Sequence, residues 1–383
     1  MNTAKSGVIN IRIGIINLNY KKIVLILLFL ILVFFVGKNL LYKDANSEPY
    51  HEIWRINLKE IITKNPVVDG EFVYVQTFTQ LFKINKDGNV VWKQEIKTNR
   101  SFVSPVVSQN LLIVVDNIGA IYAFDKNNGS LIWRHAEKNF TGESTVTVDQ
   151  VSVFGDSVYV VYFSLNIKAF DLKTGSEKWL ISVPGRSSPD MDVNEDYIVF
   201  DTYNDDAINF HDPKTGEFIK KEPYEEKYVV RDLIVNEDSL LILFKDYSNN
   251  WKLTAYDLNT YEETFNKYLE SDQFKCLTTH NGELYVFGES SYKINFETNE
   301  ILWKNEIVLE TCPVFVNEKI LLSKNDFGRG VIIDRRTGKL IEKLSYPVFP
   351  LNFLIIDKVN AVKFQENVLF PYHSKLVLLD LNN

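Results

Sequence analysis

Hydrophobic and polar residues alternate with a period of two along most of the chain after residue 50, and turn signals interrupt the alternation at regular distances. This period is typical of β-strands that bury one face, whereas a helix would need apolar residues three or four positions apart. Residues 104–125 show two such strands in succession, and residues 121–133 show a strand, a turn and a further strand. The pattern predicts an all-β protein built from short antiparallel strands.

One strand–turn–strand unit recurs through the chain. Its clearest copies are residues 121–133 and 167–179, and its other copies are residues 81–92, 207–220, 253–265, 292–303 and 331–342. The turn centres at 88, 129, 175, 216, 261, 299 and 338 lie 38 to 46 residues apart. That spacing matches the repeat length of β-propeller blades with four strands each.

Three residue types recur at fixed places in this unit. Glycine supplies the positive φ of the turn, an aspartate four residues earlier can accept hydrogen bonds from the turn amides, and a tryptophan four residues after the turn centre can wedge between neighbouring sheets. We assign these residues a structural role. They are Gly88, Gly129, Gly175, Gly216 and Gly338; Asp125, Asp171, Asp212, Asp257 and Asp334; and Trp54, Trp92, Trp133, Trp179 and Trp303.

The two ends of the repeat region complement each other. The chain stops after residues 375–383, where Asp380 occupies the aspartate position and the following strand is missing. Residues 52–58 are a strand of the missing type, with Trp54 in register. We therefore expect residues 50–383 to form an eight-bladed β-propeller of four-stranded antiparallel blades, closed by its first strand, because closure removes exposed sheet edges.

The first fifty residues have a different pattern. Residues 1–22 are basic and carry no acidic residue, and residues 23–37 are apolar without interruption. We favour an uncleaved transmembrane signal anchor over residues 23–42, with 1–22 as a cytoplasmic tail, 43–49 as a tether and the propeller on the extracytoplasmic side of the cell membrane. A cleaved signal peptide is the alternative, although no small-x-small cleavage site follows the apolar run.

Composition narrows the functional classes. The chain has 383 residues, 45% of them hydrophobic, and a formal net charge of −8, which argues against nucleic acid as a partner. Its 26 Phe, 19 Tyr and 6 Trp favour β structure. The five histidines are scattered, and no HExxH, GxSxG or phosphate-binding glycine loop occurs. Residues 190–196 resemble a calcium loop, but Glu195 replaces its glycine, so we favour a solvated strand end and expect no metal.

The repeat in residues 123–133 and 169–179 resembles that of pyrroloquinoline-quinone-type propellers. This family includes quinoprotein dehydrogenases and the propeller lipoprotein of the outer-membrane barrel assembly machine. The dehydrogenases have adjacent cysteines over their cofactor, whereas Cys276 and Cys312 are far apart here. The resemblance therefore implies a non-catalytic scaffold for envelope proteins or glycans, without a cofactor. The alternative is a propeller lyase, hydrolase or reduced quinoprotein that acts on an envelope polymer.

Inner strands of a propeller line its central channel, so the residues where they begin form a mouth. Small polar residues dominate there, and basic residues next to them could attract an acidic peptide or glycan. We predict a ligand-binding set of Lys64, Arg100, Arg186, Arg231 and Lys275. Cys276 and Cys312 occupy equivalent positions in neighbouring blades. They could form a disulfide outside the cell, although we favour two free buried thiols.

Overall fold

The computed structural model describes residues 51–96, 103–116, 119–136, 148–162, 166–183, 191–202, 206–236, 238–307, 312–323, 330–343, 359, 361–372 and 374–380. Contacts divide the chain into two units, Met1–Glu48 and Pro49–Asn383. The predicted anchor at 23–42 lies outside the described residues. Within them, no helix has the length and apolar character needed to cross a bilayer.

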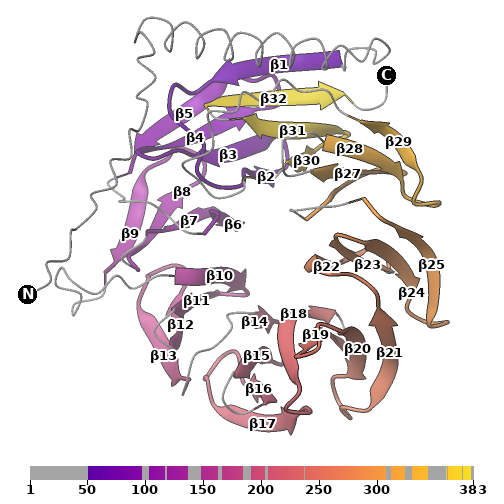
Figure 1. The fold of residues 1–383 in the computed structure, drawn as a ribbon. Coiled ribbons are helices and arrows are strands. Elements are labelled where there is room, and N and C mark those ends of the chain that lie inside the picture. The colour runs from indigo at the N-terminus through magenta and orange to yellow at the C-terminus, as the bar shows by residue number, and fades with distance from the viewer. Residues whose placement is uncertain are drawn as a thin grey trace, which may run out of the picture. The chain divides into compact units, whose positions relative to one another are not determined.

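The second unit is an eight-bladed propeller, as the repeat spacing predicts. Each blade is a four-stranded antiparallel sheet, and Figure 1 shows the eight sheets around a common centre. The first four blades consist of β2 (Val67–Asp69), β3 (Phe72–Gln76), β4 (Gln80–Asn85) and β5 (Val90–Glu95); β6 (Val106–Ser108), β7 (Leu111–Val115), β8 (Ile121–Asp125) and β9 (Leu131–His135); β10 (Val148–Phe154), β11 (Ser157–Tyr162), β12 (Asn166–Asp171) and β13 (Glu177–Ser182); and β14 (Met191–Val193), β15 (Ile198–Thr202), β16 (Ala207–His211) and β17 (Phe218–Pro223).

The other four blades complete the ring. They consist of β18 (Tyr228–Asn236), β19 (Ser239–Asp246), β20 (Trp251–Asp257) and β21 (Glu263–Leu269); β22 (Phe274–His280), β23 (Glu283–Gly288), β24 (Ser291–Asn295) and β25 (Glu300–Asn305); β26 (Val314–Val316), β27 (Lys319–Ser323), β28 (Gly330–Asp334) and β29 (Leu340–Lys343); and β30 (Val362–Phe364), β31 (Asn367–Tyr372), β32 (Lys375–Asp380) and β1 (His51–Asn57).

The eighth blade joins the two ends of the propeller. Strand β1 pairs antiparallel with β32, with His51 opposite Asp380 and Trp54 opposite Leu378. The predicted closure by the first strand is thus confirmed. Pairing with β1 covers the edge of β32, which would otherwise present unpaired amides and carbonyls to solvent.

The hydrophobic core forms between sheets. The described residues hold eight buried apolar clusters, and each contains side chains from two neighbouring blades. The second and third strands of each blade contribute most of these side chains because both of their faces are covered. Neighbouring inner strands also contact each other around the centre.

The repeated tryptophans and glycines link one blade to the next. At five interfaces the tryptophan Nε1 donates to a carbonyl of the following blade at 2.7 to 3.3 Å. The turn glycine of that blade packs against the same indole, so closely that an added Cβ would meet ring atoms at 2.4 to 2.9 Å. The five pairs are Trp54–Gly88, Trp92–Gly129, Trp133–Gly175, Trp179–Gly216 and Trp303–Gly338.

The aspartate of the repeat shapes the turn itself. At Asp171, for example, the backbone carbonyl accepts from the Gly175 amide at 2.8 Å, and carboxylate Oδ1 accepts from the amides of Lys173 and Thr174. Asp125, Asp212, Asp257 and Asp334 make the corresponding bonds. In the turns of Asp125, Asp171, Asp212 and Asp334 these bonds hold the shape that brings the glycine against the indole, whereas the turn of Asp257 has Tyr261 in place of glycine.

Candidate functional site

Two of the predicted mouth cations occupy β-bulges on adjacent inner strands. The register of β18 against β19 shifts between Val230 and Asp232, which leaves Arg231 as the extra residue. The register of β22 against β23 shifts between Phe274 and Cys276, which leaves Lys275 as the extra residue. A bulge removes a residue from the ladder and redirects its side chain, a device common beside binding sites.

Arg231 and Lys275 line the same cavity, of about 230 Å³, between the fifth and sixth blades. Lys245 joins them because β19 runs antiparallel to β18 and brings Lys245 opposite Val229. We call this space, lined also by Asp232, Leu243, Trp251, Gln273, Phe274 and Cys276, the basic cavity. Its size suits one side chain or head group, and its three cations favour an anionic one.

Asp232 is the carboxylate of the basic cavity. Its Oδ2 accepts a hydrogen bond of 2.8 Å from the Leu277 amide, so it links β18 to β22. Burial raises the pKa of Asp232 to about 6 and outweighs the backbone hydrogen bonds that lower it. Close to pH 6 the charge of the cavity therefore changes by one unit.

The same inner-strand link recurs in two earlier blades. Asp192 on β14 accepts from the Val235 amide of the next blade at 2.8 Å, and burial raises its pKa as well. The Gln150 side chain exchanges two hydrogen bonds with the backbone of Met191. Because Asp192 and Asp232 each accept an amide from a neighbouring blade, their geometry indicates a structural role. Among the described residues, no group of three His, Cys, Asp or Glu could hold a metal ion.

The other predicted mouth residues do not join the basic cavity as the structure describes it. Lys64 precedes β2 and is only 5% exposed, so its position favours packing. Arg100 and Arg186 lie outside the described residues. In the predicted calcium-like segment, the Asn194 side chain accepts from the amides of Asp196 and Tyr197 within one turn.

Cys276 and Cys312 form a disulfide in the structure, with their Cα atoms 5.4 Å apart. The prediction of two free thiols is therefore wrong. Equivalent positions on neighbouring inner strands come close near the axis, within the range that a disulfide can bridge. The bond ties β22, beside the basic cavity, to the start of the seventh blade.

These features can be compared with known proteins. Residues 49–196 match the family model described as outer membrane protein assembly factor BamB. The BamB of Kangiella koreensis is 28% identical over 147 residues, which cover 36% of this chain and 36% of that protein. The matched segments span less than half the length of the curated relatives.

Solved structures extend the likeness in fold beyond that segment. BamB from Moraxella catarrhalis has a TM-score of 0.65 at 16% identity, over 88% of this chain and 99% of that chain. Quinohemoprotein alcohol dehydrogenase from Comamonas testosteroni has a TM-score of 0.61 at 13% identity, over 85% of this chain and 72% of that one. The predicted resemblance to both branches of the family is thus confirmed, as a likeness of fold to each.

Lys245, Trp251 and Asp232 were not predicted as site residues. The predicted mouth residues come from the inner strands or from just before them, whereas Lys245 and Trp251 belong to β19 and β20. The propeller topology contains one usable signal for Lys245. Because the second strand of a blade ends where the first strand begins, the end of the strand 239–246 lies beside Arg231.

Proposed function

We propose that this chain is a non-catalytic binding scaffold of a cell envelope, and that its basic cavity holds an acidic segment of a partner protein. The observation that carries this proposal is the convergence of Arg231, Lys245 and Lys275 on one small cavity. The likeness to BamB, an assembly factor by name, supports a scaffold in the envelope.

Exposed apolar side chains favour a protein over a glycan as the partner. The outermost strands of several blades carry adjacent apolar residues that are 39% to 59% exposed. These pairs are Val90–Val91, Leu131–Ile132, Phe218–Ile219, Ile301–Leu302 and Leu340–Ile341. Such side chains gain from covering by another protein surface, whereas glycans offer mainly hydroxyl groups.

The test uses the tagged full chain in mild detergent to capture proteins from an envelope extract. The double variant Arg231→Gln/Lys275→Gln removes two cations of the cavity. Its matched control, Lys173→Gln/Lys339→Gln, removes two exposed lysines from blade turns. We expect the cavity variant to lose at least about tenfold in recovery, since loss of even one charge-assisted hydrogen bond costs roughly 1.5 kcal/mol or more.

Other outcomes separate the alternatives. Equal recovery by wild type and cavity variant would refute the role of the basic cavity. Retention of an anionic envelope glycan instead of a protein would identify the other partner class. Turnover of an envelope polymer by the purified chain would support the propeller enzyme.

We also propose that residues 23–42 attach the chain to the cell membrane with the propeller on the extracytoplasmic side. The apolar run 23–37 and its basic flanks support this topology. External protease should digest residues 51–380 in intact cells. Full protection of the propeller would contradict the outward placement.

A further inference from the structure

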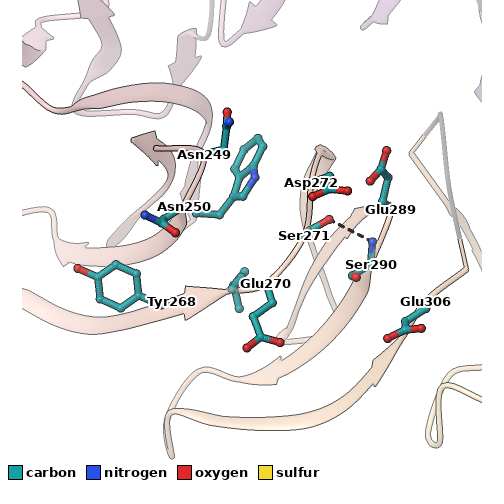
Figure 2. Close-up of a pocket in the computed structure, with 11 residues that line it drawn as sticks. Asn249, Asn250, Tyr268, Glu270, Ser271, Asp272, Glu289, Ser290 and Glu306 are labelled. Atoms are coloured by element: carbon teal, nitrogen blue, oxygen red, sulfur yellow. Dashed lines mark hydrogen bonds between the residues drawn. The ribbon is translucent and has the colours of Figure 1, made fainter. Parts of the chain in front are cut away.

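A second, larger pocket lies between the fifth and sixth blades, outside the basic cavity. Its volume is about 850 Å³, within the range of ligand-binding sites. Figure 2 shows its polar lining, which comes from the β19–β20 turn (Asn249, Asn250), the end of β21 and the link to β22 (Tyr268 to Asp272), the β23–β24 turn (Glu289, Ser290) and Glu306 after β25. We call it the acidic pocket.

The charges of this pocket are one-sided. Glu270 pairs with Lys304, at 3.1 Å between Oε2 and Nζ. Asp272, Glu289 and Glu306 make no ion pair with any residue that the structure describes. Three carboxylates around one opening that pair with no described cation produce a field that attracts a cation.

Trp251 supplies an independent sign of a missing partner. It lines the acidic pocket and is 2% exposed, and its Nε1 has no hydrogen-bond partner among the residues that the structure describes. The five repeat tryptophans, by contrast, donate their Nε1 to a carbonyl of the next blade. A buried N–H without an acceptor is unfavourable, so this indole favours an acceptor from outside the described part of the chain.

We propose that the acidic pocket binds a basic, extended peptide segment of a partner protein. A lysine or arginine side chain of the segment lies among Asp272, Glu289 and Glu306, and a main-chain carbonyl accepts from Trp251 Nε1. Tyr268, which is 62% exposed, lies across the pocket from Glu289 and Glu306 and offers its ring face to a second cation of the segment. A peptide fits both features because it carries a cation and a carbonyl acceptor a few bonds apart.

This site is separate from the proposed function. Trp251 lines both spaces, but the basic cavity selects anions and the acidic pocket selects cations. A partner that carries both kinds of charge would be bound in one orientation only, since Trp251 stands between the two.

The experiment measures binding of a capped decapeptide with three lysines, spaced by serine and glycine, to the detergent-solubilised full chain. The triple variant Asp272→Asn/Glu289→Gln/Glu306→Gln should bind at least about tenfold more weakly and lose most of its salt dependence. The control Asp87→Asn/Glu195→Gln/Glu297→Gln neutralises three exposed carboxylates elsewhere and should change affinity less than about twofold.

A second measurement tests the indole directly. In a ¹⁵N-tryptophan-labelled chain, the Nε1–H resonance that disappears in Trp251→Phe should shift on peptide addition, and Trp251→Phe should bind several-fold more weakly because one hydrogen bond is lost. Phenylalanine keeps an aromatic ring in the packing, so this variant tests the N–H and not the fold.

Three results would overturn the proposal: unchanged affinity of the triple variant, an equal loss in its control, or binding of free spermidine as tight as that of the peptide. The third result would assign the pocket to a small polyamine. Arg231→Gln/Lys275→Gln should not weaken binding of this peptide, because it removes only positive charge. Failure of the basic cavity as an acidic-segment site and failure of the acidic pocket are therefore observed with different variants and probes.

Discussion

At the scale of single residues, the turn glycines have two separate reasons to be glycine. Gly175 has φ of +69°, and an added Cβ would lie 2.4 Å from Cε3 of Trp133. Gly155 has φ of +59°, yet nothing lies within 4 Å of an added Cβ. A comparison of the two positions therefore separates the effect of backbone conformation on stability from the effect of packing against the preceding blade.

Gly175→Ala should lower the free energy of unfolding by roughly 2 to 4 kcal/mol. About 1 kcal/mol comes from the left-handed backbone conformation, and the remainder from overpacking against the indole. Gly155→Ala should lower the free energy of unfolding only by the contribution of the backbone conformation, about 1 kcal/mol. Urea denaturation of both variants measures the difference in their free energies of unfolding. Equal losses in the two variants would show that the indole of Trp133 can move aside without a loss of stability.

Asp232 gives stability a predictable pH dependence. Its folded pKa, about 6, lies above the usual value of 3.8, so the folded state binds its proton more tightly than the unfolded state does. The contribution of Asp232 to the free energy of unfolding is most favourable below pH 4, and it is lost as the pH rises from 4 to 6. Above pH 6 the ionised group costs on the order of 3 kcal/mol.

Asp232→Asn should therefore stabilise the protein at pH 7 by roughly 1 to 2 kcal/mol, because the amide oxygen can still accept from the Leu277 amide without burying a charge. At pH 4 the variant and the wild type should be about equally stable. Thermal unfolding at both pH values measures this, and a gain of the same size at pH 4 would contradict the assignment of the effect to ionisation.

At the scale of strands, the disulfide stabilises the seam between the sixth and seventh blades. It closes a loop over a sequence separation of 36 residues. Loss of such a link usually costs roughly 2 to 4 kcal/mol. Cys276→Ser/Cys312→Ser should show this loss in chemical denaturation under oxidising conditions. Addition of a reductant should destabilise the wild type but leave the double variant unchanged.

Strand order and turn positions could be predicted because each blade repeats the same local chemistry. Even where glycine is absent, Tyr261 and Asn299 adopt the positive φ that the spacing predicts, 56° and 57°. The candidate sites could be predicted only in part. Arg231 and Lys275 follow the inner-strand alignment, whereas Asp272, Glu289 and Glu306 lie on connections outside the repeated motif. Residues that meet only through tertiary packing do not recur at a fixed spacing, so the sequence repeat cannot identify them.

At the scale of the whole molecule, the propeller depends on one non-covalent joint. Seven blades are continuous stretches of chain, and the eighth holds β1 by pairing with β32. Trp54 reinforces this joint because its Nε1 donates to the Lys86 carbonyl of the first blade, and its ring packs against Gly88. Trp92 makes the equivalent contacts within the continuous part of the ring.

Trp54→Ala and Trp92→Ala remove the same side chain from the same place in the repeat, and each should cost roughly 3 kcal/mol or more. Their effects on the joint should differ. Trp54→Ala should speed hydrogen exchange at the amides of β32, since release of β1 uncovers that edge. Trp92→Ala should leave β32 protected. If both variants leave β32 as protected as in the wild type, closure does not depend on the Trp54 contacts, and the pairing of β1 with β32 is sufficient to hold the ring.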